Sequence, residues 1–206
     1  MIKAIIFDLG GVVIDSAFEP FSLKLEALYD IPKKRVYLTL QRHWDDFARG
    51  RIKEKEFWRR FAKDLKIKNK GSRLRKIMRS FFIIKPKVIG IIKKLRCHYK
   101  TALLTNVSRE WLNYVIKNYR LNRFFDVILA SYMTGYAKPS LMKSKKSNFQ
   151  IYNLLINKLK VVHDECIFVD NKKENLPPAK MLGIKTILFR NERDLREKLL
   201  VFKVKI

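Results

Sequence analysis

Four side chains suited to phosphoryl transfer follow apolar runs of the sequence. They are Asp8 in IIFD, Thr105 in ALLT, Lys138 in SYMTGYAKP and Asp170 in IFVD. A carboxylate can attack phosphorus and form an aspartyl phosphate that water later hydrolyses. A hydroxyl and an ammonium can hold the phosphoryl oxygens and stabilise charge in the transition state. Two carboxylates can share Mg²⁺, a cation that prefers oxygen ligands.

Each of these residues alone also has an ordinary structural explanation. An Asp after a strand can cap a helix or form a turn, a Thr can be a strand hydroxyl, and a loop Lys is usually solvated. The four together favour a site, because the strands of a parallel sheet all end at one edge. Open α/β folds bind their ligands at that edge.

The apolar runs that precede these residues predict buried strands, and helix-period stretches separate the later ones. Alternating strands and helices imply crossover connections and an α/β fold with a doubly wound parallel sheet. If Asn175 is the N-cap of its helix, Pro177 and Pro178 fall in the first turn, where proline is tolerated. The predicted strands are 3–9, 101–106, 125–131, 166–171 and 186–189, and the predicted helices are 110–119, 149–159, 176–182 and 193–200.

Residues 15–83 form the exception, because they show amphipathic helix patterns and no strand pattern. The expected helices are 21–29, 33–47, 53–65 and 72–82. A helical insert directly after the first strand predicts a cap, with hinges near Asp15 and Lys85, over a core of residues 1–14 and 84–206. The helical spacing of the aromatic residues Phe47, Phe57, Trp58 and Phe61 predicts packing rather than a cofactor site.

Charge is the extreme feature of the composition, with 46 Lys and Arg against 19 Asp and Glu and a formal net charge of +27. Such a surface attracts polyanions, including nucleic acid, anionic membranes and phosphorylated substrates. The basic residues are spread over most segments, so a merely solvated surface explains them equally well. The local clusters lie at 59–60, 66–76 and 143–146.

Cys97 and Cys166 are far apart and have no metal-ligand spacing, which predicts reduced thiols. The chain starts directly on its first strand, and no apolar stretch approaches the ~20 residues that a membrane helix needs. We therefore expect a cytoplasmic protein without a membrane span. The oligomeric state stays open at this level.

Four segments, IIFDLGGVV, LLTN, GYAKP and FVDNKKEN, resemble in order and spacing the motifs of the haloacid dehalogenase-like (HAD) hydrolase superfamily. FARGRIKEKEFW is similar to the signature of the subgroup with a small helical cap. The resemblance implies a Rossmann-like core with a small helical cap, Asp8 as nucleophile, and Mg²⁺ as cofactor. It implies phosphate binding by Thr105 and Lys138 with Gly11 and Asn106 beside them, and metal binding by Asp8, Asp170, Asn171 and the carbonyl of Gly10.

Three departures from the family pattern qualify this interpretation. Gly10 stands where related phosphatases carry an Asp that protonates the leaving oxygen, a contribution of typically ~10²–10⁴ in rate. Asn171 stands where an acid is usual, so metal affinity should fall. Ser140 and the insertion LMKSKKSN follow Lys138 and Pro139, where the family has an acid and a short connection.

The sequence thus favours a Mg²⁺-dependent phosphatase that acts on a small phosphorylated metabolite through an aspartyl-phosphate intermediate. The alternative is a catalytically degenerate HAD-fold protein that binds nucleic acid or another polyanion through its basic surface. Dehalogenation by the same Asp8 is less favoured, because Gly10 offers no side chain to shape a halide site. The distribution of the basic residues would separate the first two hypotheses.

Overall fold

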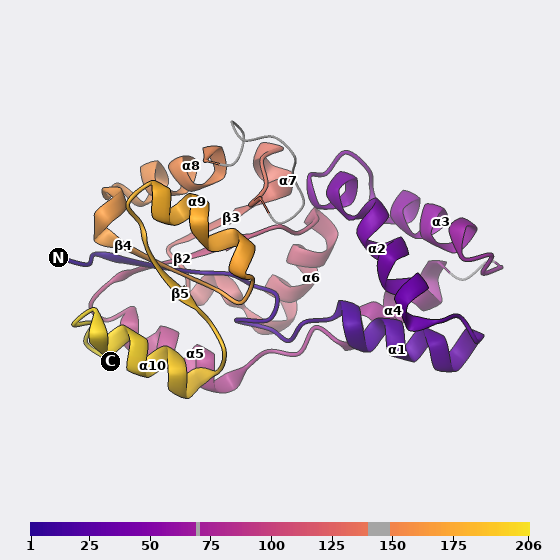
Figure 1. Ribbon diagram of the computed structural model, residues 1–206, viewed down its shortest axis with the longest axis horizontal. Coiled ribbons are helices and arrows are strands. Elements are labelled where there is room, and N and C mark those ends of the chain that lie inside the picture. Colours follow the sequence, from indigo (N-terminus) through magenta and orange to yellow (C-terminus); the bar gives the residue numbers. More distant parts are fainter. Residues whose placement is uncertain (69–70, 140–148) are drawn as a thin grey trace.

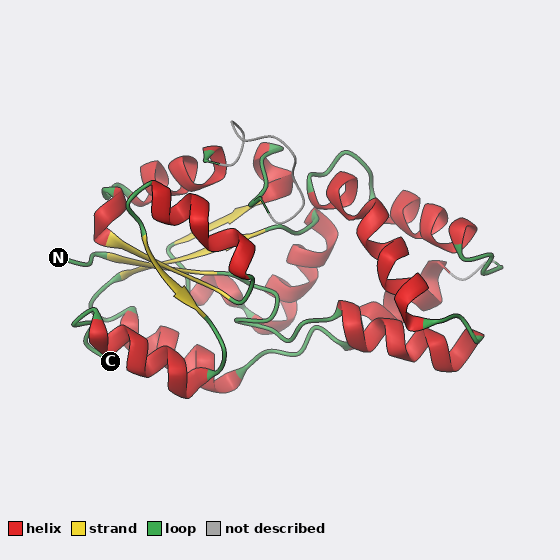
Figure 2. Cartoon of the chain, viewed as in Figure 1, coloured by secondary structure: helices red, strands yellow, loops and turns green. Residues whose placement is uncertain are grey.

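The computed structural model describes residues 1–68, 71–139 and 149–206. Its sheet has five strands in the order β3-β2-β1-β4-β5, and every neighbouring pair is parallel. This confirms the predicted doubly wound α/β core (Figures 1 and 2). The strands are β1 (Ala4–Phe7), β2 (Lys100–Thr105), β3 (Val127–Ala130), β4 (Cys166–Asp170) and β5 (Lys185–Leu188).

Helices cover both faces of the sheet, which is why its strands are apolar on both sides. Because side chains alternate along a strand, Ile5 and Phe7 pack on one face and Ile6 on the other. The first face is covered by α5 (Pro86–Leu95), α6 (Arg109–Tyr119) and α10 (Glu192–Val201), and the second by α8 (Gln150–Leu159) and α9 (Leu176–Met181). Short helices complete the connections: η1 (Leu121–Arg123), α7 (Ser131–Thr134), η3 (His163–Glu165) and η4 (Lys173–Asn175).

Helix α5 is the one long helix of the described core that the sequence analysis did not predict. Its run KVIGII is apolar and rich in β-branched residues, with Gly90 in the middle, so its composition resembles a strand. Two features indicate a helix: Pro86 lies in the first turn, and Val88, Ile92 and Leu95 are buried at helical spacing. Packing of this apolar side against the sheet decides the conformation.

Residues between β1 and α5 form the predicted group of helices. They are α1 (Phe18–Tyr29), α2 (Lys33–Ala48), α3 (Glu54–Asp64) and α4 (Gly71–Ser80). Figure 1 shows them together at the end of the molecule opposite both termini. Phe47 and Phe57 stack at 4.4 Å between ring centroids, and both are fully buried with Trp58 and Phe61. The aromatic residues therefore pack the interior of the insert, as predicted.

The two chain segments that connect the insert to the core lie side by side. The N–H of Asp15 donates to the carbonyl of Ile83 at 2.8 Å, and the N–H of Lys85 donates to Val13 at 2.9 Å. The ammonium of Lys85 also contacts the carboxylate of Asp15 at 3.1 Å. We call these two paired segments the neck. They support our proposal that the chain divides into a cap, residues 15–83, and a core, residues 1–14 and 84–206.

The insert also contacts the core away from this neck. The hydroxyl of Ser131 donates to the carbonyl of Ala48 at 2.5 Å, and the guanidinium of Arg49 donates to the carbonyl of Gly135 at 2.5 Å. The indole N–H of Trp111 on α6 donates to Glu54 on α3 at 2.9 Å. These bonds hold the helices over the carboxyl ends of β1, β2 and β3.

Three further expectations concern the rest of the chain. Cys97 and Cys166 are both free thiols. Among the described residues, no helix is long and apolar enough to cross a lipid bilayer. Ser140, the LMKSKKSN insertion and its basic cluster lie outside the described residues.

Candidate active site

Asp8, Thr105 and Asp170 lie at the ends of three adjacent strands. The N–H of Asp8 still donates to the carbonyl of Val169 at 2.9 Å, so Asp8 directly follows β1 beside the end of β4. Thr105 ends β2 on the other side of β1. All three side chains are buried, and the sheet brings them to one edge, as the sequence analysis predicted.

Lys138 bridges the two carboxylates. Its ammonium nitrogen lies 2.6 Å from Oδ1 of Asp8 and 2.7 Å from Oδ2 of Asp170, with only 2% of the residue exposed. Asn106 holds the loop that carries this lysine. The N–H of Lys138 donates to Oδ1 of Asn106 at 2.8 Å, and Nδ2 of Asn106 donates to the carbonyl of Lys138 at 3.0 Å. Asn106 therefore positions Lys138 in addition to lining the site.

Burial and charge set the protonation of this cluster. Loss of solvent raises the pKa of Asp8 to about 6, with the charge of Lys138 lowering it and that of Asp170 raising it. Burial lowers the pKa of Lys138, but the two carboxylates outweigh this effect and leave it above its usual range. At neutral pH the site thus holds an ionised Asp8 and a charged Lys138.

Asp170 is fixed by donors on three sides. Besides Lys138, it accepts from the N–H of Lys172 at 2.7 Å and from Nδ2 of Asn175 at 2.8 Å. The hydroxyl of Tyr152 in turn donates to the carbonyl of Asn175 at 2.8 Å. Asn175 does precede α9 as expected, but its side chain contacts Asp170 instead of capping the helix. The sequence analysis missed this contact, although the spacing Asp-x₄-Asn in FVDNKKEN was visible.

The glycine turn after Asp8 has two different glycines. Gly11 has a φ of +88°, and a Cβ there would lie 2.2 Å from Nδ2 of Asn171. Its N–H donates to the carbonyl of Ile14 at 2.7 Å, and substrate binding by Gly11 stays a prediction. Gly10 lies outside the left-handed region, and a Cβ there would meet no atom within 4 Å. Position 10 therefore accepts a side chain and position 11 does not.

The residues around this turn suit Mg²⁺. Oδ1 of Asn171 is buried without a hydrogen-bond partner among the described residues, although buried polar atoms are almost always bonded. It lines the same cavity as Asp8 and Gly10. Carboxylate, amide and carbonyl oxygens are the ligands of this hard cation, which commonly takes one or two carboxylates and keeps several waters. Elsewhere among the described residues, no three or more His, Cys, Asp or Glu side chains come together in a group that could hold a metal ion.

A cavity of about 350 Å³ lies between the insert and this strand edge. Its polar end is formed by the core residues Asp8, Thr105, Lys138 and Asn171. Its other walls include Phe18, Tyr37 and Trp44 from α1 and α2, and Trp111 from α6. The sequence analysis did not assign these aromatic residues to the site, because their periodicity indicates burial but not which of them border a cavity.

The doubly wound sheet thus gathers two carboxylates, a hydroxyl and a lysine beneath a helical insert, at the edge where open α/β folds bind their ligands. The chain belongs to the haloacid dehalogenase-like hydrolase family, whose model matches residues 2–183. The predicted resemblance is thereby confirmed.

Relatives along nearly the whole chain agree with this assignment. The chain is 26% identical to a D-ribitol-5-phosphate phosphatase of Bacteroides thetaiotaomicron over 98% of both proteins. It is 23% identical to a sesquiterpene phosphatase of Aspergillus oryzae over 88% of this chain and 87% of the relative. A solved HAD-family enzyme of Bacteroides thetaiotaomicron, in complex with magnesium and inorganic phosphate, shares the fold with a TM-score of 0.70. That similarity covers 92% of this chain and 95% of the other at 22% identity.

Proposed function

We propose that this protein is a Mg²⁺-dependent phosphatase that hydrolyses the phosphate ester of a small metabolite. The observation that carries the proposal is the buried Asp8–Lys138–Asp170 cluster, of which Asp8 and Lys138 line the cavity beneath the insert. The two relatives named as phosphatases support it, and since their names give a polyol phosphate and a terpenoid phosphate, they agree on the phosphate end of the substrate.

In the proposed mechanism, an Oδ atom of Asp8 attacks phosphorus, and the bond between phosphorus and the ester oxygen breaks. The phosphoryl group is then covalently bound to Asp8 and the alcohol leaves. Thr105 donates a hydrogen bond to a phosphoryl oxygen, and Lys138 stabilises the charge that develops on the oxygens. Attack of water on the aspartyl phosphate releases inorganic phosphate and restores the Asp8 carboxylate.

The leaving oxygen needs a proton, and Gly10 has no side chain that could supply it. The carboxylates of Asp15 and Glu19 also line the cavity, but they are paired with Lys85 at 3.1 Å and Lys33 at 3.3 Å. We therefore assign this proton to water, and expect esters with poor leaving groups to react slowly.

Mg²⁺ would be held by Asp8, Asp170, Asn171 and the carbonyl of Gly10. Once bound, it neutralises phosphate charge and so allows a carboxylate to approach an anion. The arms of the insert at Asp15 and Lys85 would act as the hinges of a cap formed by residues 15–83. The core residues 1–14 and 84–206 would then carry every group of the reaction.

The test is a panel of sugar, nucleotide and lipid-precursor phosphates, assayed with and without Mg²⁺. We expect turnover of at least one ester that depends on Mg²⁺ and is lost in Asp8→Asn, because the amide keeps the shape but cannot attack phosphorus. The matched control Asp164→Asn changes an exposed carboxylate away from the cavity and should keep full activity. Residual activity of Asp8→Asn above about a tenth of the wild type would exclude Asp8 as the nucleophile, whereas its melting temperature should stay within a few degrees.

A further inference from the structure

The part of the cavity beyond the phosphate end is walled by apolar side chains, and many of them are aromatic. The insert contributes Phe18, Tyr37, Trp44 and Phe82, and the core contributes Ile14, Val107, Trp111 and Val115. We propose that the substrate is a phosphate monoester with an apolar organic group, an alkyl or terpenoid chain rather than a sugar or polyol. This inference rests on the proposed function.

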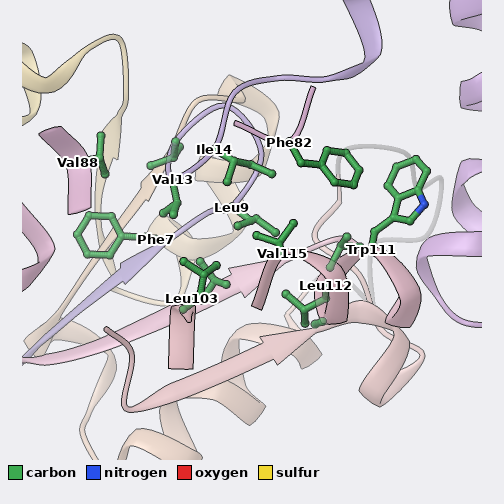
Figure 3. Packing of buried hydrophobic residues seen from close by; sticks show 14 of the residues in the cluster. Phe7, Leu9, Val13, Ile14, Phe82, Val88, Leu103, Trp111, Leu112 and Val115 are labelled. Carbon is green, nitrogen blue, oxygen red and sulfur yellow. The ribbon is translucent and has the colours of Figure 1, made fainter. Parts of the chain in front are cut away.

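The aromatic walls are held rigidly by their own contacts. Phe18 meets Trp44 edge-on at 5.0 Å, and Trp111 lies 5.3 Å from Trp44 and 5.2 Å from Phe82. Figure 3 shows Phe82 and Trp111 in one cluster with Ile14 and Val115. Such a packed wall has little freedom to rearrange around hydroxyl groups.

The indole N–H of Trp111 is also engaged within the protein. It donates to Oε1 of Glu54 at 2.9 Å, and Glu54 is itself buried and bound by Arg75 and Arg79 at 3.1 and 2.8 Å. Trp111 therefore offers the cavity ring surface rather than a hydrogen-bond donor. Glu54 acts as a positioning residue for this part of the wall.

Few polar groups are available to a ligand beyond the phosphate end. Asp15 and Glu19 are paired with lysines, which leaves Ser16, Gln41, the hydroxyl of Tyr37 and the indole N–H of Trp44 among the lining side chains of that region. A polyol would lose hydrogen bonds to water along its length and regain few of them here. An apolar chain makes no hydrogen bonds to water that it could lose, and its binding removes apolar surface from water.

The kinetic test uses esters that share a primary alkyl leaving group: butyl, hexyl and octyl phosphate against glycerol 3-phosphate and ribose 5-phosphate. We expect kcat/KM to rise by about fourfold for each added methylene until the cavity is filled, because burying a methylene is worth ~0.8 kcal/mol. Hexyl phosphate should exceed ribose 5-phosphate at least tenfold. A polyol phosphate that equals or exceeds hexyl phosphate would overturn the proposal.

Two substitutions on α2 test whether the apolar wall of the cavity causes the preference for longer alkyl chains. Trp44→Gln should reduce the dependence on chain length, and Gln41→Leu should steepen it without disturbing the packed tryptophans. Leu38→Gln is the matched control, because Leu38 lies on the same helix, is 52% exposed and does not line this cavity. An unchanged chain-length dependence in both Gln41→Leu and a folded Trp44→Gln would contradict the assignment of the wall.

Calorimetric binding of hexylphosphonate and methylphosphonate to the wild-type protein separates this inference from the proposed hydrolysis, because phosphonates are not hydrolysed. At least tenfold tighter binding of hexylphosphonate supports the apolar site, even if no ester is turned over. Equal binding of the two overturns the apolar site, even if phosphatase activity is found.

Discussion

Lys138 neutralises one of two carboxylates that would otherwise repel each other in a buried site. A lone buried charge is costly, and two like charges are more so, which is why the lysine contacts both Asp8 and Asp170. Two carboxylates face a single ammonium in this cluster, and carboxylate oxygens are ligands that a divalent cation prefers. In the proposed reaction the same ammonium would face the phosphoryl oxygens, so one residue would both stabilise the buried carboxylates and serve the reaction.

Gly10 offers a direct test of the missing proton donor. Gly10→Asp should accelerate alkyl phosphates by ~10²-fold or more and change p-nitrophenyl phosphate little, because nitrophenolate leaves without protonation. The structure permits this side chain, since a Cβ at position 10 would meet no atom within 4 Å. Single-turnover phosphorylation of Asp8 with both kinds of substrate is the measurement.

The neighbouring glycine supplies the control for that experiment. Gly11→Ala should lower the melting temperature, because φ is +88° there and the new Cβ would collide with Asn171. Equal acceleration of both substrates by Gly10→Asp, or acceleration of neither with the fold preserved, would mean that another group already donates the proton.

Asn171 is the residue at which metal affinity can be adjusted. Asn171→Asp replaces the amide, whose oxygen is buried and unpartnered among the described residues, by a charged carboxylate. Mg²⁺ should therefore bind more tightly and raise the melting temperature more than it does in the wild type. A calorimetric Mg²⁺ titration gives the same comparison without any assay of activity. Asn118→Asp, an equal charge change on the exposed side of α6, should leave Mg²⁺ affinity as it was. Unchanged or weaker affinity in Asn171→Asp would reject position 171 as a ligand.

Much of the candidate site could be predicted from the sequence because strand ends are local features. Asp8, Thr105 and Asp170 each follow an apolar run, and a parallel sheet brings such residues to one edge. The exact partners could not be predicted, because they depend on contacts far apart in the chain. Asn106 with Lys138 is an example, since the two residues lie 32 positions apart in the chain. The contacts of Asn175 with Asp170 and of the Gly11 N–H with Ile14 are local, but they depend on the geometry of their turns.

At the scale of single elements, α3 illustrates how the insert is fastened to the core. Glu54 in its first turn accepts from the indoles of Trp58 and Trp111 and pairs with Arg75 and Arg79. These partners come from α3 itself, from α4 and from α6. One buried carboxylate thus joins two helices of the insert to a helix of the core.

Glu54→Ala should therefore be strongly destabilising, by about 3 kcal/mol, since it leaves buried donors without an acceptor. For a chain of this size that corresponds to a fall in melting temperature of roughly 6–12 °C. Glu56→Ala on the same helix is the matched control: its partners Arg59 and Arg60 are exposed or half-buried, so little should change. The measurement is thermal unfolding of both variants. A similar fall in the melting temperature of the two would show that Glu54 has no special structural role.

The elements themselves could be predicted wherever local pattern and tertiary packing agree. The five strands and the helices α1–α4 are such cases, with ends displaced by a few residues. Helix α5 is the counterexample, because KVIGII combines β-branched residues with a glycine and only burial against the sheet makes it helical. The aromatic wall could not be predicted from the sequence either. The ring centroids of Trp44 and Trp111 lie 5.3 Å apart, but the two residues belong to distant parts of the chain.

On the scale of the whole molecule, the cavity lies where the two parts of the chain meet. The core provides the groups for phosphate chemistry, and the insert provides much of the apolar wall. Any movement of the insert about the neck at Asp15 and Lys85 would have to break the bonds of Ala48, Arg49 and Glu54 to the core. With the proposed hinges and the proposed substrate, opening of the insert and recognition of the substrate would involve the same helices.

The net charge of +27 also belongs to this scale, since it arises from residues spread along the chain. If it serves only solvation, a short DNA duplex should bind weakly and without regard to sequence, and binding should be lost at about 0.3 M salt, because counterion release is then the only driving force. Fluorescence anisotropy of two unrelated duplexes over a salt series measures both properties. Tight binding that persists at that salt concentration would instead favour a polyanion-binding function, because contacts beyond screened charge would be needed to hold the duplex.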